Sequence, residues 1–254
     1  MYYAITRAVS PAINQCELSY QERTGIDPGL AEKQHLALVD KLRELGCHIL
    51  SLAAEAGLPD SVFVEDCAVV LDEVAIITRP GAASRRPETE TIARALKPFR
   101  HLHYIRPPAT LDGGDVLLAG RQLYVGLSSR TNEQAIDQLR VATSIHGYTV
   151  SQVEFTACLH LKSAVTQVAE DLLLINPDWV DPAQFAPLDC LAVAHSEPHA
   201  ANVVLLDDRV IMPKKFHRTR KRLQARGIDI ETVTMTELAK AEGGVSCCSL
   251  LFQN

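Results

Sequence analysis

The segment GGVSCCSLLF, residues 243–252, decides the fold, because it ends in an apolar strand that has no partner strand after it. The chain opens in the complementary way: the apolar strand in YYAITRAVSP, residues 2–11, has no strand before it. Between these two segments the chain carries four pairs of apolar strands, each joined by a tight polar turn of the hairpin type. We therefore predict that the last strand pairs with the first and that the chain closes into a ring.

The four internal pairs share one plan with the two terminal strands. In each, the second strand runs into a polar turn rich in Arg, Ser, Thr or Pro, and three of the five such turns lead clearly into a helix. The pairs are VFVEDCAVVLD with EVAIITRP (62–80), GGDVLLAG with RQLYVGL (113–127), HLKSAVTQVAE with DLLLINP (160–177) and ANVVLLD with DRVIMP (201–213).

One polar or reactive residue is predicted to open the leading strand of each unit. These residues are Asp66, Asp115, His160, Asn202 and Cys247, and they follow one another at intervals of 42 to 49 residues. Repeats of about 45 residues are typical of units arranged around an axis. We expect one α/β domain, residues 1–254, with these side chains pointing into a shared central channel, because no linker interrupts the repeats.

Helix signals fit between the strands. Apolar residues at helical spacing predict a helix over Glu32–Leu45, and Gly46 suits the position that ends it. Pro87 is expected at the first position of a helix formed by ETETIARAL. Thr131 and Gln134 form a capping-box pattern before AIDQLRVATSI.

Composition narrows the class of protein. The formal net charge of −6 argues against a nucleic-acid or anionic-membrane partner, and the basic run Lys214–Arg226 is interpreted as a solvated helix face. The seven cysteines are odd in number and form no CxxC, so neither a disulfide framework nor a zinc knuckle is indicated. There is no signal-peptide pattern and no run of 18 apolar residues, so we expect a cytoplasmic protein.

Cys247 is the strongest candidate for chemistry. Gly243 and Gly244 precede it and allow close backbone approach, and it heads a strand in register with His160. A cysteine and a histidine brought together supply a thiolate and a proton carrier. Cys248 is expected to point to the opposite face of the strand and to be packed in the core.

Carboxylates gather at the same level of the predicted ring. Glu65 and Asp66 interrupt an apolar run, Asp112 and Asp115 flank a glycine pair, and Asp60 stands just before the first of these strands. Buried carboxylates need cationic partners or a cationic ligand. A guanidinium fits well, because carboxylates bind it through bidentate, charge-assisted hydrogen bonds.

Two arginines suggest the other end of the ligand. Arg85 in ASRRPE and Arg130 in SSRTNE occupy equivalent turns of adjacent units, where they could clamp a carboxylate. A cation at one end and a carboxylate at the other describe a free, arginine-like amino acid.

These motifs resemble the dimethylarginine dimethylaminohydrolase family, which belongs to the guanidino-group-modifying superfamily. The resemblance covers nearly the whole chain, and its strongest segments are LPDSVFVEDCAVV, IITRPGAASRRPE, ATLDGGDVLLAGRQLYVGLSSRTN, LHLKS and GGVSCCS. It implies the pentein fold, a five-bladed α/β-propeller of ββαβ-type repeats around a central channel.

The resemblance also implies a role for each matching residue. Cys247 matches the nucleophile and His160 the general acid/base, while Asp66 and Asp112 match the acids that hold the guanidinium, with Glu65 in support. The remaining matches are Arg85 and Arg130 with the carboxylate clamp, Asp60 with the contact to the substrate amine, Leu18 with the lid leucine, and Ala241 with a backbone carbonyl that faces the substrate.

The implied reaction converts asymmetric dimethylarginine or monomethylarginine to citrulline and dimethylamine or methylamine through a covalent cysteine intermediate. No cofactor is expected, although the adjacent Cys247 and Cys248 resemble those of the zinc-inhibited animal members. The partner is a small guanidino amino acid, and monomer and homodimer are both compatible with the sequence.

Several alternatives stay open at this stage. The first group is the related enzymes: arginine deiminase, Nω-hydroxyarginine hydrolase and a citrulline hydrolase would share the same residues. A non-enzymatic zinc protein with Cys247, Cys248 and His160 as ligands is a second alternative, although adjacent strand cysteines face apart and suit a tetrahedral site poorly. A catalytically dead arginine sensor is a third.

Overall fold

Five three-stranded sheets make up the computed structural model, which describes residues 1–254. In every sheet the middle strand pairs antiparallel with a leading strand on one side and parallel with an outer strand on the other. In this order of leading, middle and outer strand, the sheets are β15 (Leu250–Gln253), β1 (Tyr2–Arg7), β2 (His48–Leu52); β3 (Ala68–Val70), β4 (Val74–Ile77), β5 (His101–Tyr104); β6 (Val116–Ala119), β7 (Gln122–Leu127), β8 (Thr149–Glu154); β9 (Val165–Ala169), β10 (Leu172–Ile175), β11 (Asp189–Ala192); and β12 (Val204–Leu206), β13 (Arg209–Pro213), β14 (Asp229–Val233).

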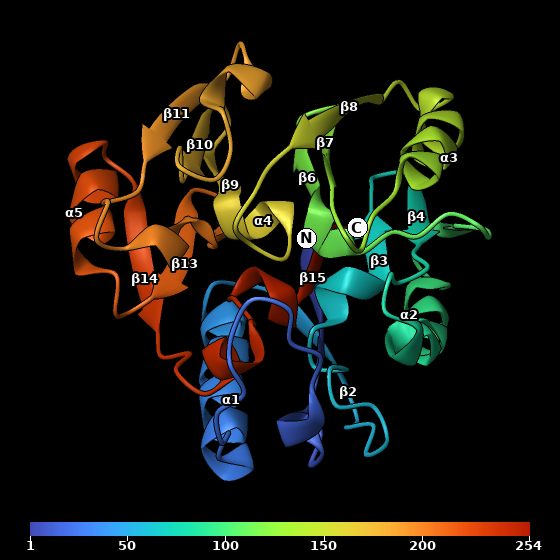
Figure 1. The fold of residues 1–254 in the computed structure, drawn as a ribbon, viewed down its shortest axis with the longest axis horizontal. Helices are drawn as coiled ribbons and strands as arrows, with labels where there is room; N and C mark the ends of the chain where they lie inside the picture. The colour runs from blue at the N-terminus through green and yellow to red at the C-terminus, as the bar shows by residue number, and fades with distance from the viewer.

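The ring closes between the two ends of the chain, as predicted. Strand β15 pairs antiparallel with β1, in a register that runs from Tyr2 opposite Gln253 to Ile5 opposite Leu250. The backbone nitrogen of Asn254 donates to the carbonyl of Met1 at 3.1 Å, and the N and C labels lie near the middle of the view in Figure 1. The pseudo-fivefold α/β-propeller is therefore confirmed.

Helices connect the middle strand of a blade to its outer strand. They are α1 (Pro28–Glu44), α2 (Thr89–Leu96), α3 (Glu133–Ser144) and α5 (His217–Ala225). All of them lie on the outside of the ring in Figure 1. In the fourth blade the connection is the 3₁₀ helix η5 (Pro182–Phe185) instead. Each repeat thus keeps the same order of elements even where the helix is reduced to one turn.

Helix α1 begins earlier than its periodicity predicted. Asp27 caps it by accepting a hydrogen bond from the Leu30 backbone nitrogen at 3.0 Å, and Pro28 takes the first helical position. The predicted end is confirmed to within a residue, because α1 stops at Glu44 and Gly46 has a φ of 94°.

The starts of α2 and α3 differ from the predictions. Pro87 lies inside the 3₁₀ helix η3 (Ala83–Glu88), so α2 begins two residues after it. The cap of α3 is Asn132, whose side chain accepts from the Ala135 backbone nitrogen at 3.1 Å. The predicted cap Thr131 faces inward instead, where its hydroxyl accepts from the backbone nitrogen of Asp112.

The predicted register residues lie just before the leading strands rather than in them, so that part of the prediction is wrong. They occupy the short 3₁₀ helices η2 (Val64–Cys67), η4 (Gly113–Asp115) and η8 (Ser246–Cys248), or the residue adjoining α4 (Leu161–Ala164) and η6 (Pro198–Ala201). These turns pack too tightly for a pleated strand. A Cβ on Gly113 would lie 2.0 Å from the Glu65 carbonyl oxygen.

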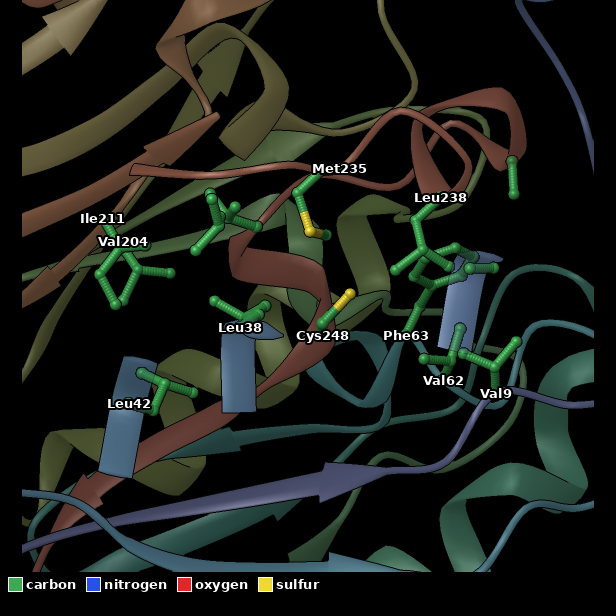
Figure 2. Packing of buried hydrophobic residues seen from close by; sticks show 14 of the residues in the cluster. Val9, Leu38, Leu42, Val62, Phe63, Val204, Ile211, Met235, Leu238 and Cys248 are labelled. Carbon is green, nitrogen blue, oxygen red and sulfur yellow. The ribbon is translucent and has the colours of Figure 1, made fainter. Parts of the chain in front are cut away.

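Apolar clusters fill the spaces between neighbouring blades. The largest contains 20 buried residues, drawn from the first and last parts of the chain and from residues 62–63, and Figure 2 shows Phe63, Met235, Leu238 and Cys248 in it. Cys248 is packed here as predicted, although it lies in η8 and not in a strand. The core thereby anchors the turn that carries its neighbour, Cys247.

Other sequence features have simple places in the fold. The basic run forms the loop before α5 and α5 itself. Its buried residues are Phe216, Thr219 and Leu223, and most of its basic side chains are exposed, in agreement with a solvated face. All seven cysteines are free thiols. None of the helices has both the length and the apolar character needed to cross a membrane.

Candidate active site

The short helices η2, η4 and η8 come together around the buried carboxylate of Asp66. The backbone nitrogen of Gly114 in η4 donates to Asp66 Oδ1 at 3.0 Å. A side chain at position 114 would displace its surroundings, because a Cβ there would lie 2.6 Å from His160 Nδ1 and 2.7 Å from Asp66 Oδ1. The glycine pair therefore lets an acid and a histidine, from the repeats before and after its own, approach each other.

His160 is held between two carboxylates. Its Nε2 lies 3.0 Å from Asp112 Oδ2, and its Nδ1 lies 3.7 Å from Asp66 Oδ1. Burial disfavours the charged ring, but Asp66, the hydrogen bond to Asp112 and the charge of Asp115 outweigh burial and raise the pKa of His160 to about 9. At neutral pH the ring is an imidazolium, which can donate a proton.

Asp112 and Asp115 are fixed by several backbone and hydroxyl donors. Asp112 Oδ1 accepts from the Gly81 backbone nitrogen at 2.8 Å. Asp115 accepts from the Ser128 hydroxyl at 2.7 Å and from the backbone nitrogen of Leu161 at 3.0 Å. Because Leu161 follows His160, Asp115 sets the position of the histidine through the main chain.

Arg85 is the buried partner of Asp66. The Arg85 side chain is only 4% exposed, and its Nη1 lies 2.6 Å from Asp66 Oδ2. Its other donors reach both oxygens of Glu88, at 3.2 and 2.9 Å, and the carbonyls of Asp60 and Phe63. Burial raises the pKa of Asp66, but His160 and Arg85 outweigh it and lower that pKa to about 2. Asp66 therefore stays ionised. In the structure Arg85 forms an ion pair with Asp66, and its predicted role of binding a substrate carboxylate stays a prediction.

Arg130 has fewer internal partners. Its Nη1 lies 3.4 Å from Asp112 Oδ2, and this is the single hydrogen bond of its guanidinium to a protein group. The Arg130 side chain is only 9% exposed, and the other donors of its guanidinium have no protein partner. The predicted binding of a substrate carboxylate by Arg130 stays a prediction.

Cys247 is half-buried beside this acid cluster. The backbone nitrogen of Gly244 donates to its Sγ at 3.3 Å. Burial, with the negative charges of Glu65 and Asp66, raises the pKa of the Cys247 thiol to about 12, against the opposing effects of Gly244 and Lys162. No hydrogen bond joins Cys247 to His160, and Asp66 influences the pKa of both. The thiol is therefore neutral unless a cation enters the site.

A polar network that the sequence did not predict supports Glu65 and the turn of Cys247. Lys162 Nζ donates to Glu65 Oε1 at 2.6 Å, and the Ser246 hydroxyl donates to Glu65 Oε2 at 2.8 Å. The Asn202 side chain donates to the Ser246 hydroxyl at 2.9 Å and accepts from the Ser246 backbone nitrogen at 3.1 Å. The one available signal was the spacing of LHLKS, which places Lys162 two residues after His160.

The remaining predicted residues border the site. Both oxygens of Asp60 face the backbone nitrogen of Glu17, at 3.1 and 3.2 Å, so Asp60 contacts the segment that carries Leu18. Leu18 and Cys247 pack against the same large apolar cluster. Ala241 ends the 3₁₀ helix η7 (Leu238–Ala241) and belongs to that cluster.

Metal binding by the cysteine pair finds little support in this geometry. The one group of three potential metal ligands consists of Asp66, Asp112 and His160, within 4.8 Å of one another, and it includes neither cysteine. The Cys248 thiol is fully buried and donates to the Gly244 carbonyl at 3.6 Å.

Sequence comparison finds clear relatives. Residues 4–185 match the family model described as N,N dimethylarginine dimethylhydrolase, eukaryotic. The chain is 36% identical over 228 residues to the N(G),N(G)-dimethylarginine dimethylaminohydrolase of Pseudomonas aeruginosa, covering 89% of this chain and 90% of the relative. It is 37% identical over 249 residues to the enzyme of the same name from Streptomyces coelicolor, covering 97% and 95%.

Comparison with solved structures agrees with the sequence comparison. The fold superimposes with a TM-score of 0.94 on the Pseudomonas aeruginosa DDAH, solved as a cysteine-to-serine mutant complexed with citrulline, and the match covers 98% of both chains at 33% identity. The similarity therefore extends around the whole ring, from sequence to three-dimensional structure.

Proposed function

Because the chain belongs to the dimethylarginine dimethylaminohydrolase family, we propose that it hydrolyses Nω-methylated L-arginines. The products are L-citrulline and dimethylamine or methylamine. The observation that carries this proposal is that η8, the turn of the half-buried Cys247, packs against η2, whose Asp66 lies 3.7 Å from the imidazole of His160. The enzyme is a hydrolase that acts on a C–N bond of a linear amidine.

The charge of the site favours a cationic substrate. Six carboxyl groups meet four cationic side chains there: Asp60, Glu65, Asp66, Glu88, Asp112 and Asp115 against Arg85, Arg130, His160 and Lys162. A guanidinium would offset the excess of negative charge that burial makes unfavourable. We assign Asp66 and Asp112 to accept hydrogen bonds from the N–H groups at its edge, with Glu65 in support.

Substrate binding also explains how Cys247 becomes reactive. The pKa of the thiol is raised to about 12 by burial and by the charges of Glu65 and Asp66. A bound guanidinium neutralises those charges, lowers the pKa and favours the thiolate, and the thiol proton passes to solvent. The nucleophile is therefore generated chiefly when a cation is in place.

The reaction then proceeds in two stages. The thiolate attacks the guanidinium carbon and forms a tetrahedral adduct. Protonated His160 donates to the departing amine as the C–N bond breaks, which leaves a thiouronium intermediate on Cys247. Neutral His160 next takes a proton from water, and the hydroxide adds to the same carbon. The C–S bond then breaks as the proton of the new hydroxyl group passes to the sulfur, which releases citrulline and the Cys247 thiol.

The two ends of the substrate are assigned to residues around the acid cluster. Arg130, with Arg85, would bind the carboxylate, and Asp60 the ammonium group. Leu18 would cover the ligand, and the Ala241 carbonyl would accept a hydrogen bond from it. The chemistry requires no cofactor, and the seven free thiols suit a reducing compartment such as the cytoplasm.

A substrate panel tests the proposal. Purified enzyme is incubated separately with asymmetric dimethylarginine, monomethylarginine, arginine, hydroxyarginine and citrulline, and the products are identified by mass spectrometry. We expect citrulline and the matching amine from the two methylated arginines at the highest kcat/KM. Turnover of arginine, hydroxyarginine or citrulline without turnover of the methylated compounds would reassign the enzyme to a related guanidino or ureido hydrolase.

A further inference from the structure

Glu242 accepts hydrogen bonds from three consecutive backbone amides of the Leu18 segment. The nitrogens of Ser19, Tyr20 and Gln21 lie 3.0, 2.6 and 2.7 Å from Glu242 Oε1. Successive backbone N–H groups directed at one point form an anion-binding concavity. Here the anion is a side chain from the opposite end of the sequence, and no other carboxylate in the protein binds three successive amides in this way.

This contact fixes one end of the segment Glu17–Gln21, and Asp60 fixes the other. The Glu17 nitrogen faces both oxygens of Asp60. Leu18 lies between the two anchors and packs on the apolar cluster that Cys247 also contacts. In Figure 1 the blue N-terminal loop passes beside the red segment that leads to β15. Two carboxylates thus fix the segment, one at each end.

Glu242 has two energetically unfavourable features in this position. Its backbone has a φ of 59°, the left-handed region that a side chain with a Cβ disfavours and glycine tolerates. Its second oxygen, Oε2, is buried without a hydrogen-bond partner. The left-handed backbone closes the end of η7, where the nitrogens of Glu242 and Gly243 donate to the carbonyls of Ala239 and Leu238. A glycine would serve this turn without the strain, so the contacts of Oε1 with the segment are what a glutamate adds.

We propose that Glu242 is a positioning residue that latches the segment Glu17–Gln21 over the bound substrate. The inference rests on the proposed function, because that function supplies the ligand that the latched segment would enclose. Glu242 directly follows Ala241, whose carbonyl is assigned to the substrate. One turn of chain thereby contacts the ligand and closes the segment above it. Loss of the latch should weaken substrate retention more than the chemical step.

The test compares Glu242→Gly and Glu242→Gln with a matched control, Asp207→Gly. Asp207 lies in the exposed turn between β12 and β13 with a φ of 58°, so its replacement relieves the same backbone strain away from the segment. Glycine at 242 removes both the latch and the strain, which favours folding. Glutamine keeps the shape and removes the charge, which weakens each of the three hydrogen bonds.

Two measurements are made on each folded variant. Hydrogen–deuterium exchange at the amides of Ser19, Tyr20 and Gln21 should accelerate by about tenfold or more in Glu242→Gly, less in Glu242→Gln, and not in Asp207→Gly. With asymmetric dimethylarginine, KM should rise by about tenfold in Glu242→Gly while kcat changes by less than about threefold, the pattern of lost binding common to the ground and transition states.

The outcomes separate the latch from the proposed function. Unchanged amide exchange in Glu242→Gly overturns the latch, and so does faster exchange with an unchanged KM, because the segment would then not retain substrate. If the wild-type protein does not turn over any methylated arginine, the proposed function fails. The latch is then tested by amide exchange with and without citrulline, and it is overturned if citrulline protects these amides equally in wild type and Glu242→Gly.

Discussion

The imidazole Nε2 of His160 lies 3.0 Å from Oδ2 of Asp112, a residue of the neighbouring repeat. Asp66 faces the other ring nitrogen at 3.7 Å, and Asp115 holds the main chain just after the histidine. The ring therefore keeps one orientation and carries its proton at neutral pH. This arrangement supports the proposed role of His160 as a general acid toward a departing amine.

Replacement of Asp112 should change the pH dependence of turnover. In Asp112→Asn the pKa of His160 falls from about 9 toward its ordinary value, because a hydrogen-bonded negative charge is lost. We expect kcat to fall by about 10²- to 10⁴-fold, the usual contribution of general acid–base catalysis. The alkaline limb of the kcat profile should move to lower pH, since the donor loses its proton earlier.

Steady-state measurements of kcat between pH 6 and pH 10 test the predicted shift of the alkaline limb, with Asp137→Asn as the control. Asp137 is an exposed acid on α3, paired with Arg140. An alkaline limb that stays in place in Asp112→Asn would contradict the assignment of His160 as the proton donor.

Gly244 is predicted to tolerate no side chain while Asn202 is present. A Cβ at 244 would lie 2.1 Å from Asn202 Oδ1, so Gly244→Ala must push this side chain off Ser246 and disturb the turn of Cys247. We expect a loss of about 1–3 kcal/mol in the free energy of unfolding, the range of overpacked sites, and a large loss of kcat.

Urea unfolding of the single and double variants tests this coupling. Gly244→Ala combined with Asn202→Ala should be more stable than Gly244→Ala alone, because the clash is removed. Gly57→Ala is the control, since no atom lies within 4 Å of the added Cβ. Strict additivity of the two changes would show that Asn202 does not fill this space.

His35 is predicted to weaken the protein in acid. It lies on the buried face of α1, is 2% exposed, and neither ring nitrogen has a hydrogen-bond partner. Burial lowers the pKa of His35 to about 4, below the value of about 6.5 in an unfolded chain. The unfolded state therefore binds its proton first, and stability falls as pH drops from about 6.5 through 4.

His35→Leu should remove this dependence. We expect the free energy of unfolding at pH 5 to rise by about 1–3 kcal/mol, because two unpaired buried polar atoms are replaced by an apolar side chain. Urea titrations at pH 5 and pH 8 measure it, with the exposed His101→Gln as control. Equal acid sensitivity in the wild type and His35→Leu would contradict the account.

The ring could be predicted from the sequence because its strands are local apolar runs joined by turn residues. The unpaired strands that begin at Tyr2 and end at Phe252 left one arrangement in which both find a partner. The 3₁₀ helices could not be predicted. An acid such as Asp66 among apolar residues has the sequence pattern of a strand. The turn forms instead because neighbouring repeats lie so close at Gly113 that no side chain fits between them.

The candidate site could be predicted only in part for a similar reason. Cys247, His160 and Asp66 share a position in their repeats, and spacing reveals such a set. The contacts of Lys162 and Glu242 join segments far apart in the chain, 97 residues for Lys162 with Glu65 and 223 for Glu242 with Ser19. No local pattern marks them. The bond of Arg85 to Asp66 was equally hidden, because turn arginines usually face solvent.

The central claim, attack by Cys247 on the guanidinium carbon, is tested most directly by trapping the intermediate. Wild-type enzyme and the Cys247→Ala and Cys248→Ala variants are mixed with asymmetric dimethylarginine, quenched in acid, digested and mapped by mass spectrometry, while citrulline is measured in parallel. We predict an adduct on Cys247 in the wild type and in Cys248→Ala, both of which form citrulline, and neither adduct nor citrulline in Cys247→Ala. An adduct on Cys248, or citrulline formation by Cys247→Ala, would contradict the account.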